Sequence, residues 1–338
     1  MGSEVLLLGY GVVCLSMIFF NILQSLVMHR NDLKRNERSL YLEEVLAEQF
    51  RKIENKIPAD EKHYKDLGKL LKKLPYLLAF DRMLENGDIT IRNTEFSEYL
   101  NNLQPVLVDV AKTYMKREEI QAAYYAHFLT KHRMIIHSSN TAIQQIMMDC
   151  MKKKSLYCRV NGFRGLCMFG EMSTIVEAVK INDQHEASFH GKLLTEILLT
   201  YTGEHNRLIT EFWKVMKEYS IDTKVALMNY IRLSSGDYSE KFLQILRDTT
   251  QHKELRLAAV RYLGRHIFDP AKQNLIELVL EEDDIHWEYA AIAASALAKY
   301  SGEEVVAALT KAMSSSQWFV RFNAANSLKA QRLDYEDL

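Results

Sequence analysis

One pattern near the carboxyl end constrains the fold of this 338-residue chain more than any other feature, namely Val-Arg-x-x-Ala-Ala-x-x-Leu from Val320 to Leu328. The adjacent alanines Ala324 and Ala325 allow a neighbouring helix to approach closely, while the valine and leucine fill the groove between two helices. Related patterns precede it at residues 255–263 and 289–297. A helix with such a face needs copies of itself to cover it, so the pattern predicts repeats.

Arg321 marks a register that can be followed towards the amino terminus. Equivalent positions recur every 31 to 38 residues, at Gln121, Arg159, His190, Lys224, Arg256 and Ala290. A period of this length is typical of solenoids built from helical pairs. Only 4 prolines and 13 glycines interrupt the chain, which leaves long helical stretches and no convincing strand. We therefore predict an all-α fold.

The residues around the register mark resemble the HEAT-repeat superfamily, in which two antiparallel helices form a unit and units stack into a superhelix. The resemblance is strongest over residues 253–328 and weaker over 154–181, and between 185 and 250 it rests on the register. Tetratricopeptide repeats have a similar period, but their Trp-x-x-Leu-Gly-x-x-Tyr opening is missing here. The resemblance implies a HEAT-like α-solenoid, which we place at residues 59–338.

An uncharged run of 24 residues, Val5 to Met28, precedes the repeats. At about 1.5 Å per residue such a helix covers about 36 Å, enough to cross a hydrocarbon core of about 30 Å. The acidic start and the lack of a small-residue cleavage site argue against a cleaved signal peptide. We expect a transmembrane anchor over residues 1–29 and an amphipathic juxtamembrane helix over residues 30–58.

Basic residues follow this apolar run, and none precedes it. They are Arg30, Lys34, Arg35 and Arg38. Because cationic flanks stay on the cytoplasmic side, we predict a single-pass membrane protein with its amino terminus outside and its solenoid in the cytoplasm. Two interpretations of the cations stay open: they set the topology alone, or they also contact anionic lipid headgroups.

Two polar residues, Asn21 and Gln24, lie inside the apolar run on the same helical face. Polar side chains in lipid favour contact with another helix, although each such contact contributes only about 1 kcal/mol. The alternative is that both lie near the headgroup boundary and reach water. The sequence leaves both interpretations open.

Composition and motifs argue against catalysis and against nucleic-acid binding. The 43 lysines and arginines nearly balance 44 acidic residues, so no global attraction to nucleic acid exists. Cys14, Cys150, Cys158 and Cys167 fit no zinc spacing, which favours buried, reduced thiols. Some HEAT-like hydroxylases hold iron through several His-Glu dipeptides, but only His185-Glu186 occurs here. We expect no enzyme activity, no cofactor and no metal.

A basic segment offers the alternative to a purely structural protein. Lys152 to Lys154 are followed by Arg159 and Arg164, and together they form the one dense basic patch of the body. A groove there would suit a ligand sensor or an enzyme, and it should show a defined polar pocket. Runs of charge more often mark a solvated face.

Two tryptophans mark a candidate protein-binding surface. Trp287 lies three residues before Ala290, and Trp318 lies three before Arg321, so both occupy one position in adjacent repeats. We expect them to stack along one side of the solenoid, with Arg321 beside them. They either pack between helices or anchor another protein, since tryptophan is enriched among residues that dominate interface energy.

The whole chain also resembles a family of single-pass bacterial HEAT-repeat proteins without assigned activity. The residues that carry the resemblance are Ser155–Asn161, Trp287–Ala291 and Trp318–Ala324. The resemblance implies a membrane glycosyltransferase of extracellular glycan synthesis as the partner class. We therefore predict a non-catalytic scaffold that is tethered to the membrane and binds a protein partner at the cytoplasmic face.

Overall fold

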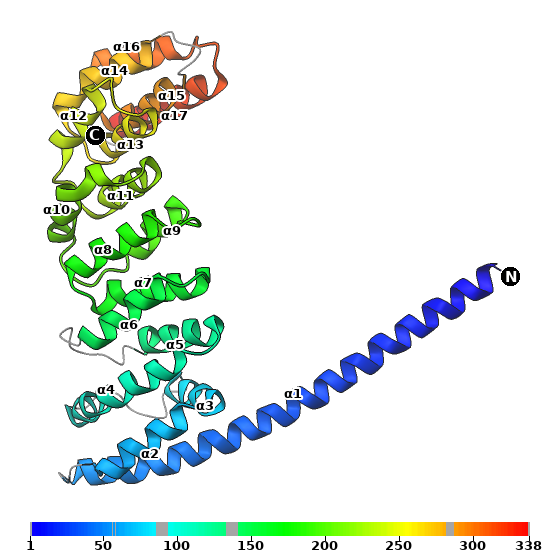
Figure 1. Cartoon of the computed structure of the whole chain (residues 1–338). Coiled ribbons are helices and arrows are strands. Elements are labelled where there is room, and N and C mark those ends of the chain that lie inside the picture. The colour runs from blue at the N-terminus through cyan, green and yellow to red at the C-terminus, as the bar shows by residue number, and fades with distance from the viewer. Residues whose placement is uncertain are drawn as a thin grey trace. The chain divides into compact units, whose positions relative to one another are not determined.

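The protein is helical throughout its described part, in agreement with the predicted all-α fold (Figure 1). A computed structural model describes residues 2–55, 57, 59–85, 94–132, 141–281 and 287–336, and no strand occurs among them. The chain divides into two compact units, Met1–Gly165 and Leu166–Leu338. The predicted boundaries at residues 29 and 58 both fall within the first unit.

The first unit begins with α1 (Gly2–Glu54), a single uninterrupted helix whose amino-terminal half projects away from α2 and α3 (Figure 1). The large apolar side chains from Leu8 to Met28 are exposed on it. Among the described residues, α1 is the one helix long and apolar enough to cross a membrane, judged by length and composition. The predicted anchor and juxtamembrane segments thus share one helix as far as Glu54, while Pro58 lies outside the described residues.

The carboxyl half of α1 packs against α3 (Leu74–Glu85) and α4 (Thr94–Tyr114), and α2 (Glu61–Leu71) packs beside them. Leu42, Leu46 and Gln49, members of the predicted apolar stripe, are buried in this contact. The side-chain oxygen of Gln49 accepts a hydrogen bond from the backbone N of Asp60 at 3.1 Å. This half of α1 therefore covers the first helical pair of the unit.

The unit continues with α5 (Glu119–Lys131), α6 (Thr141–Met151) and α7 (Leu156–Phe169), the last of which extends into the second unit. The helical pair predicted at residues 96–116 and 120–133 corresponds to α4 and α5, and Tyr125 and Phe128 are buried as expected. The turn and loop predicted at residues 86–92 lie outside the described residues.

A half-buried carboxylate joins α3 to α5 in this unit. Asp81 accepts hydrogen bonds from the Tyr124 hydroxyl, from Lys131 Nζ at 3.0 Å and from His132 Nε2. Burial by itself would raise the pKa of Asp81, but the hydrogen bonds from His132, Tyr124 and Lys131 outweigh it and hold the pKa well below its usual range. Lys131 also bonds Glu85, so α5 is held to α3 at two carboxylates.

The second unit consists of two layers of helices. The first helices α9 (Gly191–Leu198), α11 (Ile221–Ser234), α13 (Lys253–Arg265), α15 (Trp287–Ala296) and α17 (Trp318–Glu336) pack on one another in sequence. The second helices are α8 (Met172–Asp183), α10 (His205–Val215), α12 (Ser239–Arg247), α14 (Lys272–Leu280) and α16 (Glu303–Ala312). Short 3-10 turns extend the ends of three elements, η1 (Met216–Glu218), η2 (Asp269–Ala271) and η3 (Leu297–Lys299).

The predicted register agrees with the starts of the first helices. Arg159, Lys224, Arg256, Ala290 and Arg321 are each the fourth residue of α7, α11, α13, α15 and α17. His190 is the exception, because it caps α9 and its ring accepts a hydrogen bond from the backbone N of Lys192 at 3.3 Å. The register is one turn early in this repeat, where no sequence motif supported the spacing.

Close backbone approach and tyrosine hydroxyls hold adjacent repeats together. A Cβ added to Gly264 of α13 would lie 2.7 Å from the Cβ of Ala296 in α15, so only glycine fits this crossing. The Tyr300 hydroxyl donates to the carbonyl of Leu263 at 2.9 Å and accepts from the backbone N of Phe268 at 3.2 Å. Tyr262 bridges the preceding repeat similarly, bonding the carbonyl of Ser235 and the backbone N of Tyr238.

Candidate protein-binding surface

Trp287 and Trp318 are the first residues of α15 and α17, so they occupy equivalent positions in adjacent repeats, as the spacing predicted. Trp318 is 55% exposed and Trp287 is half-buried. Val320 and Ala324, on the opposite side of α17, are buried, which fixes the outward direction of the tryptophan face. Packing between helices therefore accounts for part of Trp287 and for little of Trp318.

The two tryptophans do not stack along the solenoid as a simple ladder, because Phe319 lies against both of them. Its ring stacks on Trp287, with centroids 5.5 Å apart and planes at 10°, and meets Trp318 edge-on at 4.9 Å. Trp318 in turn stacks on Phe322, with centroids 4.9 Å apart and planes at 16°. We name these four residues the aromatic cluster.

Phe319 and Phe322 are the members of the aromatic cluster that the sequence interpretation missed. Phe319 is 53% exposed and Phe322 is 48% exposed, so each presents about half of its surface to solvent. The signal was present in the spacing, because Trp318 and Phe322 are four residues apart and so share a helical face. Four aromatic residues thus form one continuous surface over the starts of α15 and α17.

Arg321 fastens α17 to the turn that precedes it. Its Nη1 donates to the carbonyls of Ser315 at 2.7 Å and Ser316 at 2.8 Å. Arg256 does the same one register mark away, where its Nε donates to the carbonyl of Leu246 at 3.1 Å. The contacts of Arg321, predicted as a protein-binding residue, are those of a residue that positions the cluster above the turn.

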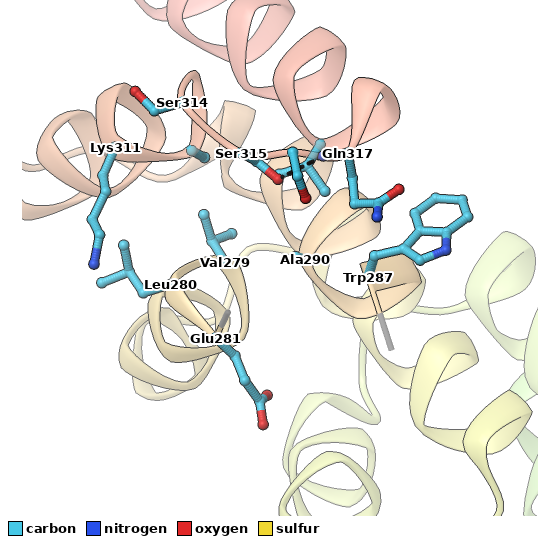
Figure 2. A pocket seen from close by; sticks show the side chains of 12 residues that line it. Val279, Leu280, Glu281, Trp287, Ala290, Lys311, Ser314, Ser315 and Gln317 are labelled. Carbon is cyan, nitrogen blue, oxygen red and sulfur yellow. Dashed lines mark hydrogen bonds between the residues drawn. The ribbon is translucent and has the colours of Figure 1, made fainter. Parts of the chain in front are cut away.

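A cavity of about 410 Å³ adjoins the aromatic cluster (Figure 2). Trp287 and Gln317 lie on one side of it, and Lys311 and Leu280 on the other (Figure 2). The turn from Ser314 to Gln317, which Arg321 holds in place, forms part of its lining. The lining mixes apolar side chains with hydroxyl, amide and charged groups, which suits a side chain of another protein.

The predicted membrane residues lie on α1. The side-chain amide of Asn21 donates to the carbonyl of Met17 at 2.9 Å within the same helix, and Gln24 is exposed. Of the flanking cations, Arg30 and Lys34 are exposed and Arg35 is half-buried. Arg38 lies over the ring of Tyr76 at 5.9 Å, so this cation also contacts α3.

The basic segment around Lys152 does not form the groove that the alternative function requires. Lys153 Nζ donates to the carbonyl of Met115 at 3.3 Å, and Lys152 lies 3.7 Å from Asp149. Arg159 is 1% exposed, and its burial lowers the pKa of its guanidinium. These residues belong to the turn between α6 and α7, while the grooves that we describe lie in the second unit.

Three of the four cysteines are buried as free thiols, and Cys14 is exposed on α1. A hydrogen bond with Cys158, together with burial, raises the pKa of the Cys150 thiol. Burial raises the pKa of Cys167. Within the described ranges, no group of three or more histidine, cysteine, aspartate or glutamate side chains is arranged to hold a metal ion.

The helical pairs, the close alanine and glycine crossings and the register together match a known repeat. Residues 239–329 match the model of the HEAT-repeat family. The match covers α12 to most of α17 and so includes the whole aromatic cluster. Among curated proteins, none matches the chain. HEAT repeats are in general a scaffold for protein interaction rather than a catalytic fold.

Proposed function

We propose that this protein is a non-catalytic scaffold, anchored in the cell membrane by α1, that binds a protein partner through its HEAT repeats. The observation that carries the proposal is the aromatic cluster, whose four rings contact one another yet remain about half exposed. A contiguous exposed apolar surface marks an interaction site more often than scattered apolar residues do. Tryptophans at its centre are suited to supply most of the binding energy.

The membrane part of the proposal rests on α1. Its exposed apolar half has no partner helix among the described residues, while its carboxyl half packs on α3. The cations follow the apolar run, so we place the amino terminus outside and both units in the cytoplasm. A membrane-bound partner would then meet the scaffold in the plane of the bilayer.

The resemblance to single-pass bacterial HEAT-repeat proteins supports a membrane glycosyltransferase as the partner. Such a partner would present a cytoplasmic segment to the aromatic cluster, and one of its side chains would enter the cavity beside Trp287. This assignment is testable by copurification of the full chain from detergent-solubilised membranes followed by mass spectrometry.

Substitution of the tryptophans tests the binding surface. We expect Trp287→Ala together with Trp318→Ala to abolish copurification of the partner with little change in melting temperature. Tyr157→Ala is the matched control, because Tyr157 is 70% exposed on α7, outside the cluster. A large loss of stability with the partner retained would show that the tryptophans are core residues and that binding occurs elsewhere.

Labelling in intact cells tests the topology. In a Cys14→Ser background, a cysteine at Ser3 should react with a membrane-impermeant maleimide. A cysteine at Ser314, in the second unit, should react only after the cells are opened. Labelling of the Ser314 position in unbroken cells would reverse the orientation.

A further inference from the structure

Three arginines gather at the carboxyl ends of two adjacent first helices in the second unit. Arg261 and Arg265 are four residues apart and share a face of α13. Arg232 is near the end of α11, which packs on α13, and its carbonyl is 2.8 Å from His266 Nε2 just after α13. That hydrogen bond holds the ends of the two helices together, so the three guanidinium groups share one region of the surface.

No carboxylate among the residues that the structure describes forms an ion pair with any of these arginines. Arg232 is half-buried, and its Nε donates only to the side chain of Asn229 at 3.3 Å. Burial, followed by the nearby charges of Arg265 and Arg261, lowers the pKa of Arg232. Like charges held together in this way oppose folding, and an anionic ligand would relieve the repulsion.

A groove of about 880 Å³ runs beside the cluster between α9, α11 and α13, and Arg232 forms part of its lining. Its acidic residues lie at the other end, since Asp222 and Glu254 are each the second residue of their helix. Asp222 and Arg232 are ten residues apart in α11, which is about 15 Å along the helix. The groove is thus acidic at one end and basic at the other.

The apolar part of the groove lies beside the arginine. Leu233, Leu199 and Val225 line it, and they offer contact for side chains rather than for a bare inorganic ion. The volume likewise exceeds what one phosphate or sulfate would fill. A peptide segment fits both features, because it can place an acidic side chain at the guanidinium groups and apolar side chains along the groove.

We propose that Arg232, Arg261 and Arg265 bind carboxylates of an acidic peptide segment of another protein, which lies along the groove between α9, α11 and α13. This deepens the proposed scaffold function by naming the chemistry of a partner at a second surface. It does not depend on the aromatic cluster, because none of the four rings lines this groove. Guanidinium groups suit the role, since they bind carboxylates through paired hydrogen bonds.

The simpler explanation is that the arginines offset the negative ends of the α11 and α13 dipoles. The two explanations predict opposite effects of neutralisation. If the arginines only compensate the helix dipoles, Arg265→Gln lowers the melting temperature of the free protein. If the cluster is a repulsive binding site, neutralisation leaves the melting temperature unchanged or raises it.

Binding of a synthetic glutamate-rich peptide to the purified full chain in detergent tests the proposal. We expect the double variant Arg232→Gln/Arg265→Gln to bind the peptide at least about tenfold more weakly, as loss of charge-assisted bonds requires. Arg207→Gln is the matched control, because Arg207 is an exposed arginine on α10, in the other helical layer. It should bind as the unsubstituted protein does.

Each remaining outcome overturns the assignment. Absence of peptide binding, or binding that the double variant retains, shows that the arginines do not form the site. Stabilisation by sulfate with no preference for the peptide at equal ionic strength shows a small-anion site instead. The assay uses no natural partner, so loss of copurification in the tryptophan variants and loss of peptide binding here are separate results.

Discussion

The two units differ in what joins their helices. In the second unit, adjacent repeats meet through backbone crossings and tyrosine hydroxyls that recur from one repeat to the next, as at Gly264 and at Tyr262 and Tyr300. In the first unit, single polar clusters perform this role, such as Asp81 between α3 and α5. The family match lies entirely in the second unit. A repeat model therefore recognises the region where the same contact is made several times.

The difference has an energetic consequence. Where every repeat makes similar contacts with its neighbours, stability is approximately a sum of nearest-neighbour contributions. Where one carboxylate holds three donors, most of the contact is lost when that carboxylate is lost. We therefore expect a larger effect from one substitution in the first unit, and hydrogen exchange measured peptide by peptide can locate each effect.

The largest effect is expected from Asp81→Asn. The substitution removes the charge that the Tyr124, Lys131 and His132 groups bond, and we expect a loss of about 2 to 3 kcal/mol in the free energy of unfolding. Hydrogen exchange should increase in α3 and α5 and remain unchanged in α13 to α17. The exposed carboxylate Asp66, which lies 2.8 Å from Lys69, provides the control, and Asp66→Asn should change little.

The Asp81 contribution also depends on pH. Because the pKa of Asp81 is lowered in the folded protein, its stabilisation is present above the ordinary carboxyl range and is lost as the pH falls through its folded value. The unsubstituted protein should therefore lose more stability below about pH 4 than Asp81→Asn does. Parallel acid unfolding curves for the two proteins would contradict the network.

An intermediate effect is expected from Gly264→Ala. The new Cβ would lie 2.7 Å from the Cβ and 2.8 Å from the Cα of Ala296, so α13 and α15 must separate, at a cost of about 1 to 3 kcal/mol. Higher helix propensity returns at most about 1 kcal/mol. Gly191→Ala is the control, since its Cβ would meet Ala226 at an ordinary 3.6 Å. Unchanged or increased stability in Gly264→Ala would remove the close crossing as a feature of the repeats.

A smaller effect is expected from Tyr300→Phe, which removes one hydroxyl and keeps the ring. Two backbone groups, the carbonyl of Leu263 and the N–H of Phe268, lose their partner, and we expect a loss of about 1 kcal/mol. Exchange should increase in the loop between α13 and α14. Tyr157→Phe, at an exposed position on α7, should have no effect, and equal effects of the two substitutions would show that the bridge contributes nothing.

The sequence predicted the regular unit better than the polar clusters, for a physical reason. The alanine pairs at Ala258 and Ala259 and at Ala290 and Ala291 predict buried crossings, because small side chains have one use at such positions, and all four are buried. The partners of Asp81 lie 43 to 51 residues away, and no local pattern links them. Contacts of that range depend on the fold itself.

The same limit applies to the candidate site. The spacing placed Trp287 and Trp318 at equivalent positions, but the place of Phe319 between them depends on side-chain rotation that the sequence does not encode locally. Arg321 likewise could point outward or fasten the preceding turn, and only its distances to Ser315 and Ser316 decide between these. The domain boundaries and the binding roles remain predictions.

The smallest effect concerns a buried histidine of the first unit. His63 Nε2 lies 2.7 Å from the hydroxyl of Tyr99, and burial lowers the pKa of His63 although the charges of Asp60, Glu48 and Asp66 partly oppose the change. Burial also holds the pKa of Tyr99 well above its usual value, so the phenol keeps its proton and donates it to the neutral imidazole. A folded pKa below the unfolded one means that His63 stabilises the fold above about pH 6.5 and loses this contribution as the pH falls through its folded value. We therefore expect the unfolding free energy of the unsubstituted protein to fall more between about pH 7.5 and about pH 5.5 than that of His63→Gln. His185→Gln is the control, because His185 is a histidine of the second unit, and it should leave the pH dependence unchanged. If His63→Gln has the same pH dependence as the unsubstituted protein, the imidazole is not held neutral, and the first unit's sensitivity to acid is due to its carboxylates alone.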